Sequence, residues 1–473
     1  MKTYENSGYE KYIIIFISLF LIVSFILGSI NRIISVEEVI IITSLLLGIL
    51  SLWIPDIVLY GFLVGAIIIP NEVLPILSNS DLALSFGAIR LHPAGIVIFL
   101  GSFLNVLKKR KLLLIKIKQQ KEIHIVIAIM IIFIISIFSQ TYLFRGMNGL
   151  PLCLENYIFP FVFFLFLIII KQENISRFLK IFVSFILVIS ILAVIEYIFK
   201  HNYLYHQLYA NSSINWYDKV RGDIYRSTTT IGHPLKNSVY FLFSIPLCIY
   251  LYKKPFNIIS IILLSLAILT TGSRVAFVLT IFAIVICTLR IKVNFINYNK
   301  LFAILCVITI SIYLLLFISP LGRTLLIRFS EGYTSTSIRV GGINNLPYII
   351  KNHFVHGIGL GLSYEVSSSF LKYEHIDFEN PWIMMITDVG LITSLLYIFV
   401  ILCIIRNMIK YVRFIRCLPF IIISFALILI MCSSFDSFGY RNNLNFLLWF
   451  NIGLFYSIVL IRKDIKWLKK SRV

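Results

Sequence analysis

The feature that most constrains this chain is a succession of long apolar runs, separated by short polar segments, from one end to the other. A helix needs roughly 20 mainly apolar residues to cross a bilayer, and most of the runs are close to that length. Hydrophobic residues make up 59% of the sequence, against roughly 45–50% in a soluble domain. Because single cores stop growing at about 250–300 residues, no soluble fold could hide so much apolar surface. The pattern therefore predicts an all-α polytopic membrane protein and excludes water-soluble enzymes, disordered chains and secreted disulfide scaffolds.

We expect about 12–14 transmembrane helices, with all 473 residues in one integral-membrane domain. The first run lacks a small-residue cleavage site, so it is expected to be retained as a helix. The fourteen candidate spans are residues 12–30, 38–54, 57–70, 92–107, 123–143, 156–170, 179–199, 237–252, 256–272, 275–290, 301–319, 383–404, 418–435 and 444–461.

Basic residues are distributed unequally between the two sides of this expected topology. An even number of helices puts both termini on one side, which then receives 27 of the 42 Lys and Arg residues but only six of the 21 acids. The whole formal net charge of +21 therefore lies on the terminal side. Because cytoplasmic loops are enriched in Lys and Arg, we expect both termini to be cytoplasmic. The same rule accounts for the positive charge without nucleic acid as a partner.

Two segments on the other side are long, residues 200–236 and 320–382. Long loops are uncommon without a function, so we expect these two to form the active-site face. The first loop carries Arg221, Arg226 and His233 near the start of the next helix. Arginine offers a fixed fork of donors that suits phosphate oxygens. A solvated loop with ordinary charges is the alternative interpretation.

Ser273 and Arg274 end one apolar run just before the next begins, which puts Arg274 at the outer end of a tight helical hairpin. An arginine at membrane depth is costly and usually pairs with another group. The alternative is that its side chain reaches out to the lipid headgroups. The pattern favours a functional role.

The second long loop combines an amphipathic stretch with a cluster of titratable residues. Residues 337–351 are predicted to form a helix on the membrane surface, with Arg339 pointing away from its apolar side. Directly before the next membrane helix, a carboxylate or imidazole beside an apolar wall can be tuned as a general base. The candidates for that base are Glu379, His375 and Asp377. An acidic, solvated helix entry is the alternative for each of them.

Two further features accompany this loop. The run from Gly357 to Gly361 follows no predicted strand, so it indicates a turn-rich crossing of backbone and not a dinucleotide site. Asp388 lies inside the following apolar run, where an ionisable group needs a partner. We expect Asp388 to pair with a nearby arginine.

Motifs for several other chemistries are missing from the sequence. It contains no P-loop, no H-E-x-x-H and no D-x-D, and its seven cysteines form no C-x-x-C pair. We therefore expect no ATP hydrolysis, no metal and no cofactor.

Four segments occur in a specific order. The first is an arginine followed by a G-x-P turn and a membrane helix, Arg226 to Lys236, and the second is T-G-S-R at the end of a helix, Thr271 to Arg274. The third runs from Arg339 to Gly361 and ends in HFVHGIGLG, and the fourth runs from Glu379 through Asn-Pro-Trp to D-V-G-L at Leu391. In order, spacing and expected outer-face position, these segments resemble the bacterial O-antigen ligase and O-antigen polymerase superfamily.

The resemblance implies a GT-C-like membrane glycosyltransferase of the bacterial cytoplasmic membrane, acting on its outer face. Its substrates would be undecaprenyl-diphosphate-linked oligosaccharides, and its expected partners a chain-length regulator and a flippase. By motif position, the implied diphosphate and substrate ligands are Arg226, Arg274 and Arg339, with Arg221, His233 and His356 as further candidates.

One departure favours the polymerase branch. Ligases of this superfamily are similar to one another in having His-Asn before the helix that follows the long loop, and this chain has Glu379-Asn380. The expected activity is therefore polymerisation of lipid-linked repeat units, with Glu379 or a neighbour as base. The alternatives are a ligase that transfers polymer to lipid A–core, a flippase or other transporter, and a structural membrane component.

Overall fold

The computed structural model describes residues 36–68, 85–86, 89–90, 92–202, 225–292, 351, 355–361, 380–412, 417–433 and 444–470. Its α-helices are α2 Val36–Leu50, α3 Asp56–Leu63, α5 Pro93–Lys108, α6 Arg110–Gln119, α7 Lys121–Arg145, α8 Leu150–Cys153, α9 Phe159–Ile169, α10 Gln172–Phe199, α12 Pro234–Leu251, α13 Phe256–Thr270, α14 Arg274–Lys292, α20 Pro381–Tyr411, α21 Leu418–Cys432 and α22 Leu444–Lys470. Two π-helical segments, η1 Val64–Ile68 and η3 Leu154–Ile158, and a 3-10 turn, η2 Gly146–Gly149, join them. One two-residue antiparallel ladder pairs β1 Ser85–Phe86 with β2 Ile89–Arg90.

The expected helical membrane architecture is confirmed. Twelve of the fourteen candidate spans coincide with helices, and the other two, 12–30 and 301–319, lie outside the described residues. Within the part of the chain that the structure describes, five helices are long and apolar enough to cross a membrane, and seven shorter apolar helices accompany them. The chain is a multi-pass helical membrane protein.

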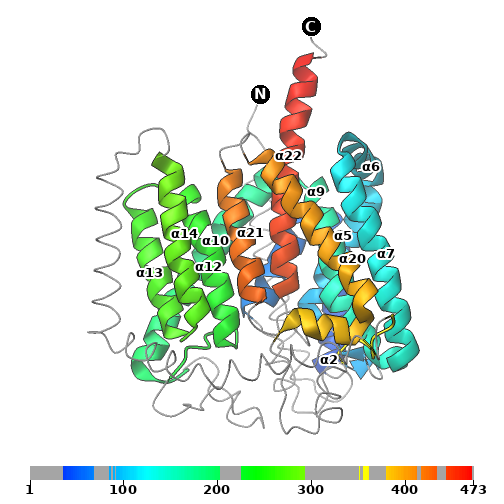
Figure 1. The fold of residues 1–473 in the computed structure, drawn as a ribbon, viewed down its shortest axis with the longest axis horizontal. Coiled ribbons are helices and arrows are strands. Elements are labelled where there is room, and N and C mark those ends of the chain that lie inside the picture. Colours follow the sequence, from blue (N-terminus) through cyan, green and yellow to red (C-terminus); the bar gives the residue numbers. More distant parts are fainter. Residues whose placement is uncertain are drawn as a thin grey trace.

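The helices stand side by side in a bundle (Figure 1). α22, drawn in red, extends beyond its neighbours at the end where the C-terminus lies, and α6 lies at that end as well. We call this the C-terminal end of the bundle. The turn between α13 and α14 lies at the opposite end, because α14 leads back toward the C-terminal end (Figure 1).

The centre of the bundle is built from helices that are apolar on every side. α9 reads FPFVFFLFLII, and a helix without a polar face is stable only when it is buried. It packs against α5 and α22. Next to it the Phe62 ring stacks on Phe182, with centroids 5.7 Å apart, and contacts Phe450 at 5.0 Å. These ring contacts join α3, α10 and α22 in the centre of the bundle.

Candidate functional site

The loop that precedes α12 is attached to the end of α10 by one buried carboxylate. Glu196, in the last turn of α10, is 5% exposed and accepts four hydrogen bonds. Its Oε1 accepts from the Tyr225 hydroxyl at 2.7 Å and from the Thr228 amide and hydroxyl at 2.8 and 3.0 Å. Its Oε2 accepts from the Thr229 amide at 2.7 Å. Because a buried carboxylate is stable only when its lone pairs are satisfied, this contact holds residues 225–229 in one conformation.

The same loop is joined to the turn between α13 and α14. The Arg226 Nε donates to the Thr271 carbonyl at 2.7 Å, and the Ser227 amide donates to the Thr270 carbonyl at 3.0 Å. The hydroxyls of Ser227 and Thr270 lie 2.6 Å apart. Gly272, with φ of +63°, lies directly under the Arg226 side chain, because a Cβ there would be 3.4 Å from Arg226 Nε. The first two predicted motifs therefore form one structure.

Two helices begin at this junction. α12 starts at Pro234 after its N-cap His233, and α14 starts at Arg274, with the Ser273 hydroxyl accepting from the Ala276 amide at 3.3 Å. Helix N-termini carry partial positive charge and free amides, so they favour anions. Among the described residues, these two N-termini, Arg226 and Arg274 bring positive charge to the junction.

His233 is neutral at physiological pH. Its Nδ1 accepts a hydrogen bond from the Leu235 amide at 3.2 Å, so the proton of the neutral ring lies on Nε2. Burial, and then the positive charges of Lys236 and Arg226, lower the pKa of His233 to about 3. The ring can therefore donate a hydrogen bond from Nε2, but it is a poor general base.

Asn237 connects the loop to the first turn of α12. Its Oδ1 accepts from the Thr229 hydroxyl at 2.9 Å, and its Nδ2 donates to the Ser227 carbonyl at 3.1 Å. Sequence reasoning did not single out Asn237 or Glu196. A carboxylate in the last turn of an apolar helix, followed by a threonine-rich loop, is the signal that could have identified Glu196.

The glycine-rich segment 355–361 docks on a break in α20. The amides of Ile358 and Gly359 donate to the carbonyls of Thr387 and Asp388, at 2.9 and 2.8 Å. The Gly361 amide donates to the Asp388 carboxylate at 2.9 Å. This confirms a turn-rich crossing of backbone, and it joins the third and fourth predicted motifs.

The break requires glycine on both sides. Gly390 has φ of +76° and ψ of 162° inside α20, a conformation essentially restricted to glycine. A Cβ on Gly390 would lie 2.5 Å from the Val355 carbonyl, and one on Gly357 would lie 2.4 Å from the Asp388 carbonyl. The backbones of the two segments are therefore too close together for a side chain at either position.

An arginine from a third helix contacts the same segment. Arg145, at the end of α7, donates from Nη1 to the Leu360 carbonyl at 2.8 Å. The Asp388 carboxylate accepts from the Gly361 amide of the same segment, and its pairing with an arginine stays a prediction. Arg145 and Asp388 therefore both form hydrogen bonds with the segment 355–361.

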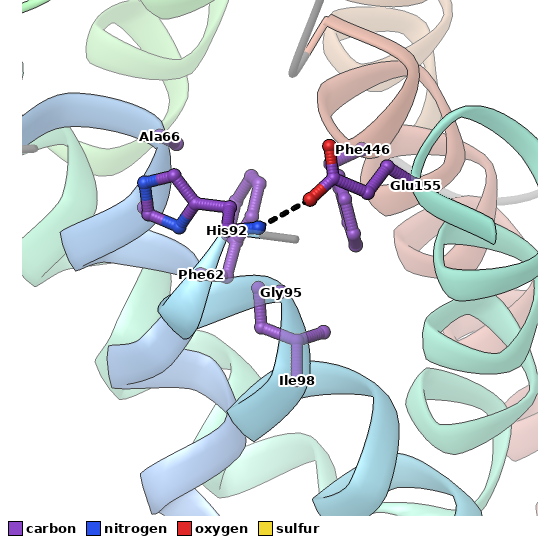
Figure 2. Close-up of a pocket in the computed structure, with 8 residues that line it drawn as sticks. Phe62, Ala66, His92, Gly95, Ile98, Glu155 and Phe446 are labelled. Carbon is purple, nitrogen blue, oxygen red and sulfur yellow. Dashed lines mark hydrogen bonds between the residues drawn. The ribbon is translucent and has the colours of Figure 1, made fainter. Parts of the chain in front are cut away.

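A small cavity lies between η1, η3 and the start of α5 (Figure 2). Phe62, Ala66, His92, Glu155 and Phe446 are among the residues that line it, and it has room for about one water molecule. The Glu155 carboxylate accepts from the His92 backbone amide, and the His92 ring points away from it (Figure 2). His92 is the N-cap of α5, because its Nδ1 accepts from the Ala94 amide at 3.1 Å. The Glu155 carboxylate adds to this, since anionic groups stabilise helix N-termini.

The structure brings some of the predicted site residues together. Arg226, Arg274 and His233 belong to the junction at the start of α12 and α14, and His356 is exposed in the turn just before Gly357. The others, Arg221, Arg339, His375, Asp377 and Glu379, lie outside the described residues. Asn380 caps α20 by accepting from the Trp382 and Ile383 amides, so the acidic segment leads directly into that helix N-terminus.

Among the described residues, no three His, Cys, Asp or Glu side chains gather as a metal site would require. A comparison with models of protein families finds no match, and neither does a comparison with curated protein sequences.

Proposed function

We propose that this protein polymerises undecaprenyl-diphosphate-linked oligosaccharide repeat units into O-antigen or a related surface polysaccharide, on the outer face of the cytoplasmic membrane. The observation that carries the proposal is the junction between residues 225–229 and the turn at Thr270–Arg274. Two helix N-termini and two arginines meet there, at the end of the bundle opposite the basic C-terminal end. A diphosphate leaving group needs preorganised positive charge where its own charge grows.

The contacts of Arg226 suit this role. Its Nε donates to the Thr271 carbonyl, which orients the guanidinium, and its two terminal nitrogens carry the remaining N–H donors. A guanidinium fixed in this way binds two phosphate oxygens with little loss of side-chain entropy. His233 would add a neutral donor at Nε2.

The reaction would proceed in one displacement. The acceptor hydroxyl of a single lipid-linked repeat attacks the anomeric carbon of the donor chain. The bond from that carbon to the diphosphate oxygen breaks, and undecaprenyl diphosphate leaves with the electron pair. The hydroxyl proton passes to a base, for which Glu379, with His375 and Asp377 nearby in sequence, is the candidate. The donor chain is then one repeat longer.

The test is a gel of surface polysaccharide from a deletion strain complemented with wild-type protein, Arg226→Gln, Arg274→Ala or Arg406→Ala. Arg406 is exposed on α20 and serves as the control for loss of one arginine. We expect the deletion to collapse the polymer ladder to a single-repeat band. Wild type and Arg406→Ala should restore the ladder, and the other two variants should not.

Two other outcomes would replace the proposal. If the deletion removes all attached repeats while lipid-linked polymer accumulates, the protein is a ligase. If lipid-linked single repeats accumulate facing the cytoplasm, the protein is a transporter. Restoration of the full ladder by both Arg226→Gln and Arg274→Ala would show that the junction is not required for polymerisation.

A further inference from the structure

α6 lies at the C-terminal end of the bundle, away from the turn between α13 and α14 (Figure 1), and lysines stand at its start. Lys108 and Lys109 lie between α5 and α6, and Lys171 lies between α9 and α10. Lys171 follows the end of α9, against which Lys116 holds α6, so the three lysines stand near one another. The Lys108 Nζ donates to the Leu52 carbonyl at 2.7 Å. Burial, and then the charges of Lys108 and Lys171, lower the pKa of Lys109. Positive charge therefore gathers at the start of α6 and α10.

Two helices, α6 and α10, start at these lysines. Lys109 is the N-cap of α6 and Lys171 is the N-cap of α10, and neither helix has a side-chain hydrogen bond to its first amides. Lys109 is also the C-cap of α5, where a basic residue is favourable. Lys171 has no such compensation, and a basic N-cap is unfavourable next to the positive end of the dipole of α10. An anion at this place would satisfy the amides and offset the repulsion.

Two acids near this end, among the residues that the structure describes, are engaged by other groups. Glu122 forms a salt bridge with Lys410, and Asp56 accepts a hydrogen bond from Asn174. Glu173, exposed in the first turn of α10, is the acid nearest to Lys171 in the sequence. It offsets only part of the charge of three lysines.

α6 also exposes apolar side chains. It is ten residues long, about 15 Å, which is too short to cross a bilayer. Leu113 is buried against the bundle, whereas Leu112, Leu114 and Ile115 are 39%, 56% and 54% exposed. The Lys116 Nζ donates to the Ile168 carbonyl at 2.7 Å and fixes α6 against the end of α9. Apolar residues beside lysines on a short helix are typical of a segment that lies in the headgroup region.

From these observations we infer that the cluster of Lys108, Lys109 and Lys171 binds the phosphate groups of anionic phospholipids, with the exposed apolar residues of α6 among the acyl chains. The partner is a lipid leaflet and not free phosphate, because Leu112, Leu114 and Ile115 would gain nothing from a soluble anion. This surface is independent of the proposed polymerase activity.

The experiment measures retention of phosphatidylglycerol, against phosphatidylcholine, by the purified full-length protein in detergent, using native mass spectrometry. The variant is Lys109→Gln with Lys171→Gln. The matched control is Lys253→Gln with Lys254→Gln, two exposed lysines between α12 and α13. Wild type and the control should retain phosphatidylglycerol preferentially. The variant should lose about fivefold in apparent affinity for each lysine removed.

Two further arms identify the ligand and guard against misfolding. Leu114→Ser with Ile115→Ser should weaken phosphatidylglycerol retention without a change in charge, and inorganic phosphate at the same concentration should not displace the lipid. The melting temperature of each variant without added lipid checks that it is folded. Equal retention of both lipids, an equal loss in the control, displacement by phosphate, or specific capture of an acidic protein in place of lipid would each overturn the inference.

Discussion

Gly390 is the single residue on which the docking of the glycine-rich segment most depends. Its backbone conformation is one that L-residues rarely adopt, and a Cβ would lie 2.5 Å from the Val355 carbonyl. Gly146 offers a matched comparison, because it also has a positive φ, of +58°, but a Cβ there would meet nothing within 4 Å. Substituting alanine at each glycine therefore distinguishes the cost of backbone strain from the cost of a steric clash.

We predict that Gly146→Ala costs about 1–3 kcal/mol, the strain of the conformation alone. Gly390→Ala should cost clearly more, because the segment 355–361 must also move away from α20. Thermal unfolding of the purified variants in detergent measures both. Equal losses in the two variants would show that the close approach at Gly390 contributes nothing to stability.

At the scale of elements, the connection between α10 and the loop before α12 rests on Glu196. Glu196→Ala would leave four buried donors without their acceptor, and each such group costs about 1–3 kcal/mol. In Glu196→Gln the amide nitrogen would face the Thr229 amide, so two donors would oppose each other. Because the same loop carries Arg226, both the stability of the fold and the presentation of that guanidinium depend on this contact.

We predict a loss of roughly 3 kcal/mol or more for Glu196→Ala and a smaller loss for Glu196→Gln. Polymer length in complemented cells should fall in the same order. Glu173→Gln, on the exposed first turn of the same helix, is the control and should behave as wild type. A wild-type melting temperature in Glu196→Ala would mean that the loop is held by its other contacts, with the end of α13 and with Asn237 of α12.

At the scale of the whole molecule, the charge distribution predicts the orientation in the membrane. Because 27 of the 42 basic residues and only six acids fall on the side of the termini, we expect that side to be cytoplasmic. A green fluorescent protein fused after Val473 should fluoresce. Alkaline phosphatase fused after Lys200 should be active, and the same enzyme fused after Lys254 should be inactive. The reversed pattern would put the junction of Arg226 and Thr271 on the cytoplasmic side and remove the basis for an outer-face reaction.

The spans could be predicted from the sequence because the bilayer imposes local rules. An apolar run of sufficient length must form a helix that satisfies its own backbone groups, whatever its neighbours are. Twelve of the expected spans accordingly coincide with helices of the structure. The asymmetry of charge is likewise a property of the sequence alone.

Which helices become neighbours is decided only by the tertiary structure. Lipid tails are as apolar as leucine, so hydrophobic patterning does not say which helix packs against which. The bond from Arg226 to Thr271 joins residues 45 apart, and the contact of Gly361 with Asp388 joins residues 27 apart. The sequence determined that this chain spans a membrane and which residues stand at the ends of its helices. Close backbone approach at Gly390 and the four donors around Glu196 decided which of those ends form a site, because such contacts depend on packing at distances of about 3 Å.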